Sequence, residues 1–236
     1  MSFDGVLKKM KPLIIIQCRF SSTRLPGKAL YPINGIPILV FLIRRLKCVS
    51  IKGKIIVATT ERPEDDPVAA WAEYENVEVV RGETDDVLSR YLKCLEIFPS
   101  NIVVRVTGDN PLTDPGIINL VIDEMGTGNW DYINTINGYP YGAGVDAFKS
   151  VIIQDLNKVV HDSAEREHLD LHIHNNKKRF QSCDMAPPDE LARDDVRITI
   201  DTLEDWHRMK RLLANIREPL KISLKDVIKR YDSLSS

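Results

Sequence analysis

The chain has 236 residues, of which 43% are hydrophobic and 28% charged, and these proportions are ordinary for a folded globular protein. Its formal net charge is −2 and its pI is about 6.2, so no general positive field points to a nucleic-acid partner. The longest apolar run, residues 36–43, contains a proline and is far too short to span a bilayer, which argues against a membrane protein.

The N-terminal region and the cysteines favour a cytoplasmic protein. Residues 1–12 lack the apolar segment of a signal peptide. The cysteines are far apart and form no C-x-x-C pair, which is typical of reduced thiols in the cytosol. A zinc site or a disulfide framework is therefore not expected. The four residues are Cys18, Cys48, Cys94 and Cys183.

A first buried strand leads into a basic loop. Residues 14–16 are an unbroken run of isoleucines, as expected for a strand that is buried on both faces of a parallel sheet. The loop that follows carries Arg19, Arg24 and Lys28. Three cations on one loop suit a polyanion, because opposite charge and donor geometry together hold phosphate. Gly27 would let the backbone approach a phosphate closely. The alternative interpretation is a solvated basic connection.

Strands and helices then alternate along the first half of the chain. The apolar spacing predicts a helix that begins at Pro37, and proline and cap signals predict another that begins at Pro115 behind Asp114. Between them we expect strands at 54–59, 77–80 and 102–106 and helices at 65–74 and 85–97. This alternation at short spacing predicts an α/β fold with a doubly wound, mostly parallel sheet.

The pattern changes in the second half of the chain. We expect short β-like pieces at 132–148, a polar helix at 163–176, a strand near 179–183, and a strand at 196–200 that returns to the sheet. Capping-box patterns, Thr202 with Asp205 and Ser223 with Asp226, predict the last two helices. We therefore expect a single domain, residues 1–236, with a small inserted α+β lobe at about 132–195.

Two aspartates stand directly after expected strands. Asp109 follows the strand at 102–106 and precedes Asn110 and Pro111, and Asp201 follows the strand at 196–200. In open α/β sheets, ligands bind beyond the carboxyl ends of the strands, where these aspartates and the basic loop would meet. Mg²⁺ prefers one or two carboxylates together with phosphate oxygens and water. The other interpretation is that both are ordinary turn or cap residues.

Several motifs together resemble those of the cytidylyltransferase family, which includes the CMP-Kdo synthetases and the SpsF-type spore-coat polysaccharide proteins. Residues 17–28 (Q-C-R-F-S-S-T-R-L-P-G-K) resemble its Q/P-A-R-x-x-S-T-R-L-P-G-K signature, with Cys18 in place of alanine. Residues 104–115 and 197–205 resemble V-R-I-T-G-D-C-P-L-I-D-P and R-L-T-V-D-T-P-E-D-L. Residues 81–91 and 166–168 match the SpsF-type R-G-x-x-D-D-V-L-x-R-Y and R-E-H.

The resemblance implies a fold like that of the nucleotide-diphospho-sugar transferases and a Mg²⁺-dependent nucleotidyl transfer. CTP would activate a sugar or sugar acid to a CMP-sugar, with release of pyrophosphate, in surface polysaccharide biosynthesis, and the protein would be a homodimer. Carried over to this sequence, the catalytic residues are Arg19 and Lys28, and Asp109 and Asp201 hold the metal. The nucleotide-binding residues are Gln17, Arg19, Ser22, Arg24, Gly27 and Lys28, and the weaker sugar-binding set is Tyr139, Asp146, Arg166 and His168. For Arg166 and His168 the alternative is a salt-bridged helix surface.

The sequence departs from the family at one point. After Tyr139 and Pro140 the family usually has G-x-D-x-E, whereas here the aligned residues are Gly142, Gly144 and Asp146, so the first acid is missing and the second is shortened. This puts the acceptor, and even activity, in question. The alternatives are a glycosyltransferase that uses a ready-made nucleotide sugar, a nucleotidyltransferase that uses another nucleoside triphosphate, and a nucleotide-binding protein without turnover. An Asp-x-Asp motif, common in glycosyltransferases, is not present at Asp109.

Overall fold

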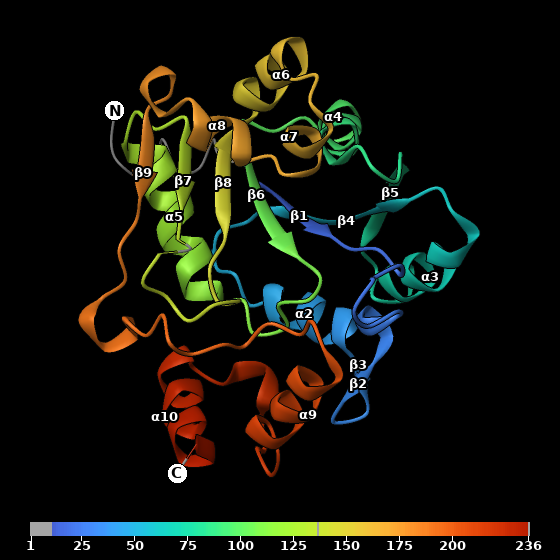
Figure 1. The fold of residues 1–236 in the computed structure, drawn as a ribbon, viewed down its shortest axis with the longest axis vertical. Coiled ribbons are helices and arrows are strands. Elements are labelled where there is room, and N and C mark those ends of the chain that lie inside the picture. The colour runs from blue at the N-terminus through green and yellow to red at the C-terminus, as the bar shows by residue number, and fades with distance from the viewer. Residues whose placement is uncertain (1–10, 136, 236) are drawn as a thin grey trace.

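A computed structural model of the protein describes residues 11–135 and 137–235. The expectation about residues 1–12 therefore falls almost entirely outside the described residues. A seven-stranded sheet runs through the molecule (Figure 1), in the order β5-β4-β1-β6-β8-β7-β9. The strands are β1 (Leu13–Gln17), β4 (Lys54–Thr60), β5 (Glu78–Gly82), β6 (Ile102–Thr107), β7 (Tyr132–Asn134), β8 (Asp146–Lys149) and β9 (Ser182–Asp184).

The first half of the chain builds the parallel part of this sheet. β1 lies in the middle and pairs in parallel with β4 and β6, and β5 continues the sheet beyond β4. β8 is antiparallel to both β6 and β7, and β9 is parallel to β7. The predicted α/β fold with a mostly parallel sheet is confirmed. The segment expected as an inserted lobe supplies β7, β8 and β9, which extend this sheet.

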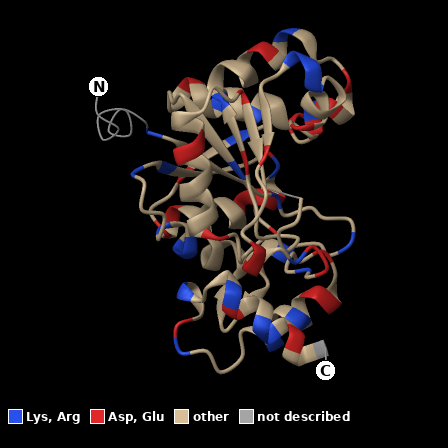
Figure 2. Cartoon of the chain, turned by 90° about the vertical axis from the view of Figure 1, so that its left-hand side faces the viewer, with Lys and Arg blue, Asp and Glu red and all other residues tan. Residues whose placement is uncertain are grey.

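Helices cover both faces of the sheet, because successive side chains of a strand point to opposite faces. Ile14 and Ile16 of β1 pack in one core with α2 (Ile38–Leu46), α3 (Asp66–Tyr74), α5 (Pro115–Thr127), α9 (Leu203–Leu212) and α10 (Leu224–Ser235). Leu13 and Ile15 pack in the other with α4 (Val87–Ile97), α6 (Ser150–Val159) and α8 (Leu171–Asn175). Figure 2 shows the strands as a largely uncharged layer, with most charged residues on the helices and loops.

Most of the helix caps expected from the sequence are present in the structure. The Asp114 side chain accepts hydrogen bonds from two backbone N–H groups of α5, and Thr202 and Asp205 form the capping box of α9. A two-residue Asn34-Gly35 turn, both residues with positive φ, joins the short strands β2 (Pro32–Ile33) and β3 (Ile36–Pro37), which the sequence analysis did not identify. It did not identify α6 either. Short 3₁₀ helices lie at Lys28–Leu30, Pro63–Asp65, Lys177–Arg179, Asp189–Leu191 and Pro219–Lys221.

Two expectations for the second half were wrong. The polar helix expected at 163–176 is two short helices, α7 (Ser163–Glu167) and α8, separated by a turn at 168–170. Residues 196–200 do not form a strand of the sheet. Only Arg197 makes an isolated bridge, to Tyr141, and the Ile200 N–H donates to the Asp109 carbonyl oxygen at 2.9 Å. Their apolar side chains are buried, and this burial produced the strand-like pattern. In the part of the chain that the structure describes, no helix is long and apolar enough to cross a membrane.

Candidate active site

The site is a cavity of about 350 Å³ beyond the carboxyl ends of β1 and β6. These two strand ends are in close contact, since a β-carbon at Gly108 would lie 2.7 Å from the Cys18 sulfur. The Gly108 N–H also donates to the Gln17 carbonyl oxygen at 2.9 Å. The basic loop after β1 and the Asp109 loop after β6 are therefore held against each other, as the sequence predicted.

The basic loop is anchored from β4 and shaped by one glycine. The buried Asp65 carboxylate accepts hydrogen bonds from the backbone N–H of Phe20 and from Thr60. Gly27 has a φ of 71°, a value that side chains rarely tolerate, and a β-carbon there would lie 2.9 Å from the Phe20 ring. Gly27 is not among the residues that line the cavity, so its position supports a role in the turn and not contact with phosphate. The sequence analysis missed Asp65.

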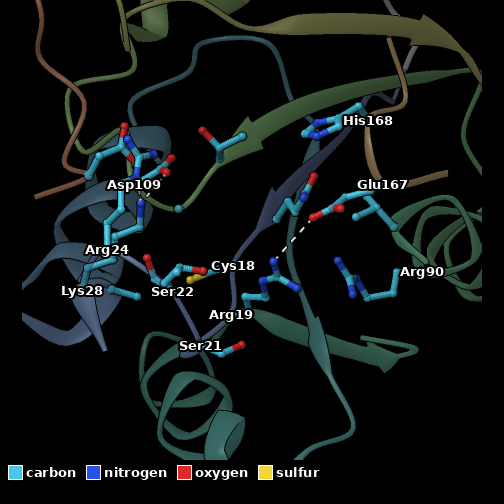
Figure 3. Close-up of a pocket in the computed structure, with 17 residues that line it drawn as sticks. Cys18, Arg19, Ser21, Ser22, Arg24, Lys28, Arg90, Asp109, Glu167 and His168 are labelled. Atoms are coloured by element: carbon cyan, nitrogen blue, oxygen red, sulfur yellow. Dashed lines mark hydrogen bonds and ion pairs between the residues drawn. The ribbon is translucent and has the colours of Figure 1, made fainter. Parts of the chain in front are cut away.

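Lys28 joins the two aspartates at one end of the cavity (Figure 3). Its Nζ donates to Asp109 Oδ2 at 2.7 Å and to Asp201 Oδ1 at 2.9 Å, although these residues are far apart in the sequence. Burial acts to lower the pKa of Lys28, but the two carboxylates outweigh it and raise the pKa above its usual value. Arg24 and Arg197 also pair with Asp201, at 2.9 and 2.6 Å. This end is thus a cluster of charges of both signs.

Arg19 lies at the other end of the cavity, away from Arg24 and Lys28 (Figure 3). It pairs with Glu167 of α7 at 3.5 Å and with Asp85 at 3.8 Å. Arg90 of α4, which the sequence analysis named only within a motif, lines the same end and donates to the carbonyl oxygens of Glu83 and Thr84. The three cations of the basic loop therefore lie at two different ends of one cavity.

Of the predicted site residues, eight line this cavity and four do not. Those that do are Gln17, Arg19, Ser22, Arg24, Lys28, Asp109, His168 and Asp201. Arg166 donates to Asp86 and to the Val160 carbonyl oxygen, which fits the salt-bridge alternative. Tyr139 is 2% exposed and packs in the core, and Asp146 lies in a neighbouring cavity. The motif matches contained the signal for Arg90, Glu167 and Arg197, but gave no indication of their partners.

The carboxylates fit a divalent cation, because Asp109 Oδ2 and Asp201 Oδ1 both lie within 2.9 Å of the one point that the lysine nitrogen occupies. Two converging carboxylates with room for phosphate oxygens suit Mg²⁺. Among the described residues, no three acidic, histidine or cysteine side chains are grouped as a complete set of metal ligands. A metal at this point would therefore need further oxygens from substrate or water.

Comparison with known proteins identifies the family. The cytidylyltransferase family model matches residues 13–227. An uncharacterized protein of Methanocaldococcus jannaschii is 34% identical over 84% of this chain and 81% of its own, and the spore coat polysaccharide biosynthesis protein SpsF of Bacillus subtilis is 29% identical over 92% of both. A cytidylyltransferase structure from Leptospira borgpetersenii superposes with a TM-score of 0.90 at 30% identity, covering 96% of this chain and 95% of that one. The resemblance of the motifs is confirmed, and this chain belongs to the cytidylyltransferase family of nucleotidyltransferase enzymes.

Proposed function

We propose that this protein transfers the cytidylyl group of CTP to a hydroxyl of a sugar or sugar acid and releases pyrophosphate. The observation that carries the proposal is the Lys28 Nζ held between Asp109 and Asp201, with Arg24 beside them, in a cavity at the carboxyl edge of the sheet. Cations and metal-binding carboxylates in one place suit a triphosphate and its metal ion.

The reaction forms one bond and breaks another at the α-phosphorus. The hydroxyl oxygen of the sugar bonds to this phosphorus, the bond to the bridging oxygen breaks, and its electron pair leaves with pyrophosphate while the hydroxyl proton passes to water. Lys28 and Arg24 bind the phosphate oxygens and stabilise the charge that develops on the leaving group. Arg19 orients the nucleotide from the opposite end of the cavity. Mg²⁺ on Asp109 and Asp201 would neutralise further phosphate charge.

Most of this chemistry is positioning, because phosphoryl transfer needs little covalent help from the protein. Asp109 and Asp201 raise the pKa of Lys28 above its usual value against the effect of burial, so this residue presents a charged ammonium to the incoming triphosphate. The role in surface polysaccharide biosynthesis, the cytoplasmic location and the homodimer are parts of the same proposal. They rest on the family and on the name of the SpsF relative.

The first experiment is a thermal-shift series with CTP, GTP, ATP, UTP and CMP-, GDP- and UDP-sugars, each with and without Mg²⁺. A ligand that binds only the folded protein raises the melting temperature by mass action. We expect a shift that is largest for CTP with Mg²⁺ and is lost in Lys28→Ala. Lys158→Ala, which alters an exposed lysine of α6, is the matched control. A shift with nucleotide sugars alone would refute the proposal and favour a glycosyltransferase, and a larger shift with GTP, ATP or UTP would favour another nucleotide.

A second experiment separates turnover from binding. Pyrophosphate release is measured with CTP, Mg²⁺ and a panel of sugars and sugar acids, for the natural protein and for Lys28→Ala. Release that depends on all three components supports the proposal. A protein that CTP stabilises, but that releases no pyrophosphate with any member of the panel, would match the non-catalytic alternative suggested by the missing acid at Gly144.

A further inference from the structure

A second cavity adjoins the first. Its volume is about 160 Å³, and Thr107, at the end of β6, lines both cavities. Asn110, which directly follows the proposed metal ligand Asp109, lines the second cavity, and so does Asp146 of β8. A group bound there would lie next to the triphosphate end of the site. This is where the proposed reaction needs its acceptor.

The described part of the chain offers no free positive charge to the second cavity. Among the described residues that line it, Arg105 of β6 is the only cation. Its guanidinium donates to Asp146 at 2.9 Å and to Asp170 at 3.3 Å, and its Nε donates to the Gln17 side chain at 3.3 Å. One cation thus faces two carboxylates, with side chains that are 12% exposed for Arg105 and 7% for Asp146.

The lack of an unpaired cation in this cavity does not depend on the protonation of Asp146. Burial raises the pKa of the Asp146 carboxyl, and Arg105 acts in the opposite direction. If Asp146 takes up a proton, Arg105 and Asp170 still cancel. A carboxylate that entered this cavity would lose its hydration without gaining an unpaired cation, and that loss is costly. A neutral or cationic group has no such penalty.

The polar atom that remains in the wall is an acceptor. The Asn110 Nδ2 donates to the Thr107 hydroxyl at 2.8 Å, which leaves the buried Oδ1 without a hydrogen-bond partner among the described residues. Hydroxyl and amino groups are the donors that complement such an oxygen. Gly142 forms the wall beside it, since a β-carbon there would lie 3.1 Å from Oδ1.

The loop opposite has no space for the missing acid. A β-carbon at Gly144 would lie 2.6 Å from the Thr135 carbonyl oxygen, and closer still to the Thr135 hydroxyl. This hydroxyl exchanges two hydrogen bonds with the backbone of Val145, so both its donor and its acceptor are already used. Thr135 and the loop backbone therefore occupy the position from which an acidic side chain at 144 would start.

We propose that this second cavity binds the acceptor, and that the part of the acceptor it holds carries hydroxyl or amino groups and no carboxylate. The acceptor is thus a neutral or amino sugar and not a sugar acid, and Asn110 is a residue that determines this specificity. The inference rests on the proposed function, since it concerns the acceptor of that reaction.

The test measures CTP-dependent pyrophosphate release with two matched panels. One contains neutral and amino hexoses and 2-ulososes, and the other contains hexuronates and 3-deoxy-2-ulosonates. We expect release with members of the first panel and at least about tenfold less with the acids, because a charge in a partly buried site interacts strongly with its neighbours. Preferential release with acids overturns this inference and leaves the proposed function in place. No stabilisation by CTP, or no release with either panel, contradicts the proposed function itself.

Two variants test the residues. Asn110→Ala should raise the acceptor KM by about tenfold and leave the CTP KM unchanged, since it removes one hydrogen bond to the acceptor. Asn101→Ala, at the opposite end of β6, is the control. Asp146→Asn should leave the preference against acids in place, because Asp170 still balances Arg105 and no unpaired cation appears in the cavity. Melting temperatures check that both variants fold, and a preference for acids in folded Asp146→Asn, or an unchanged acceptor KM in folded Asn110→Ala, overturns the inference.

Discussion

Replacing Lys28 by methionine separates two roles that the structure gives to this side chain. The ammonium lies between the carboxylates of Asp109 and Asp201, and only 14% of the side chain is exposed. In the proposed complex it binds phosphate instead. Methionine keeps most of the apolar stem and removes the charge, so the variant tests the charge more than the packing.

The expected loss of CTP affinity follows from one charge-assisted hydrogen bond. Such bonds contribute about 1.5–3 kcal/mol, which corresponds to a rise in Kd of roughly 10- to 150-fold. The metal affinity should change in the opposite direction. Without nucleotide, the lysine competes with a divalent cation for the two carboxylates, so its removal should allow Mn²⁺ to bind to the variant alone. The wild type should need CTP for tight Mn²⁺ binding.

Calorimetry with CTP and electron paramagnetic resonance of free Mn²⁺ measure these two effects separately. Lys158→Met is the control, because the exposed Lys158 pairs with Asp155 on the surface of α6. If Lys28→Met binds CTP as the wild type does, Lys28 does not bind the triphosphate. If its affinity for Mn²⁺ alone is unchanged, the two aspartates do not form the metal site.

Three further predictions concern stability and reactivity. Gly144→Ala should lower the free energy of unfolding by about 1–3 kcal/mol in a denaturant titration, because its β-carbon would overlap with Thr135; an unchanged midpoint would contradict the close packing. Arg45→Met should lower the free energy of unfolding by about 3–5 kcal/mol in the same titration, because the buried guanidinium donates to three main-chain carbonyls and a carboxylate. A decrease of less than about 1 kcal/mol would contradict this account. Iodoacetamide at pH 8 should label the exposed Cys48 and leave Cys18 unmodified, because burial raises the pKa of the Cys18 thiol to about 12. Mass spectrometry of the native protein measures the labelling, and early labelling of Cys18 would contradict its burial.

The parallel half of the fold could be predicted because its physical signals are local. A strand buried on both faces gives a short continuous apolar run, and Leu13 to Ile16 supply side chains to both cores. Caps such as Asp114 mark the helix starts within a few residues of sequence. The carboxyl edge of a parallel sheet then fixes where the site lies.

The other half depends on contacts that no local pattern specifies. The apolar and polar residues at 196–200 alternate as in a strand, yet backbone hydrogen bonds of this segment go to Tyr141 and Asp109 in loops. A buried extended segment that has no neighbouring strand shows the same apolar periodicity as a strand of a sheet, so the sequence pattern does not distinguish the two. The turn between α7 and α8 likewise lies beside a tertiary contact, the ion pair of Arg166 with Asp86, the N-cap of α4.

The two halves of the candidate site differ in the same way. The proposed nucleotide end comes largely from one loop, so a family motif of twelve residues identifies it. The motif does not show that Arg19 pairs with Glu167 while Lys28 pairs with Asp109. The proposed acceptor end is assembled from separate segments, because the charge of Arg105 is balanced by Asp146 and Asp170. The sequence shows that an acid is missing at 144, but only the structure shows that Thr135 fills its place. The proposed acceptor specificity therefore rests on the part of the site where motif similarity is least informative.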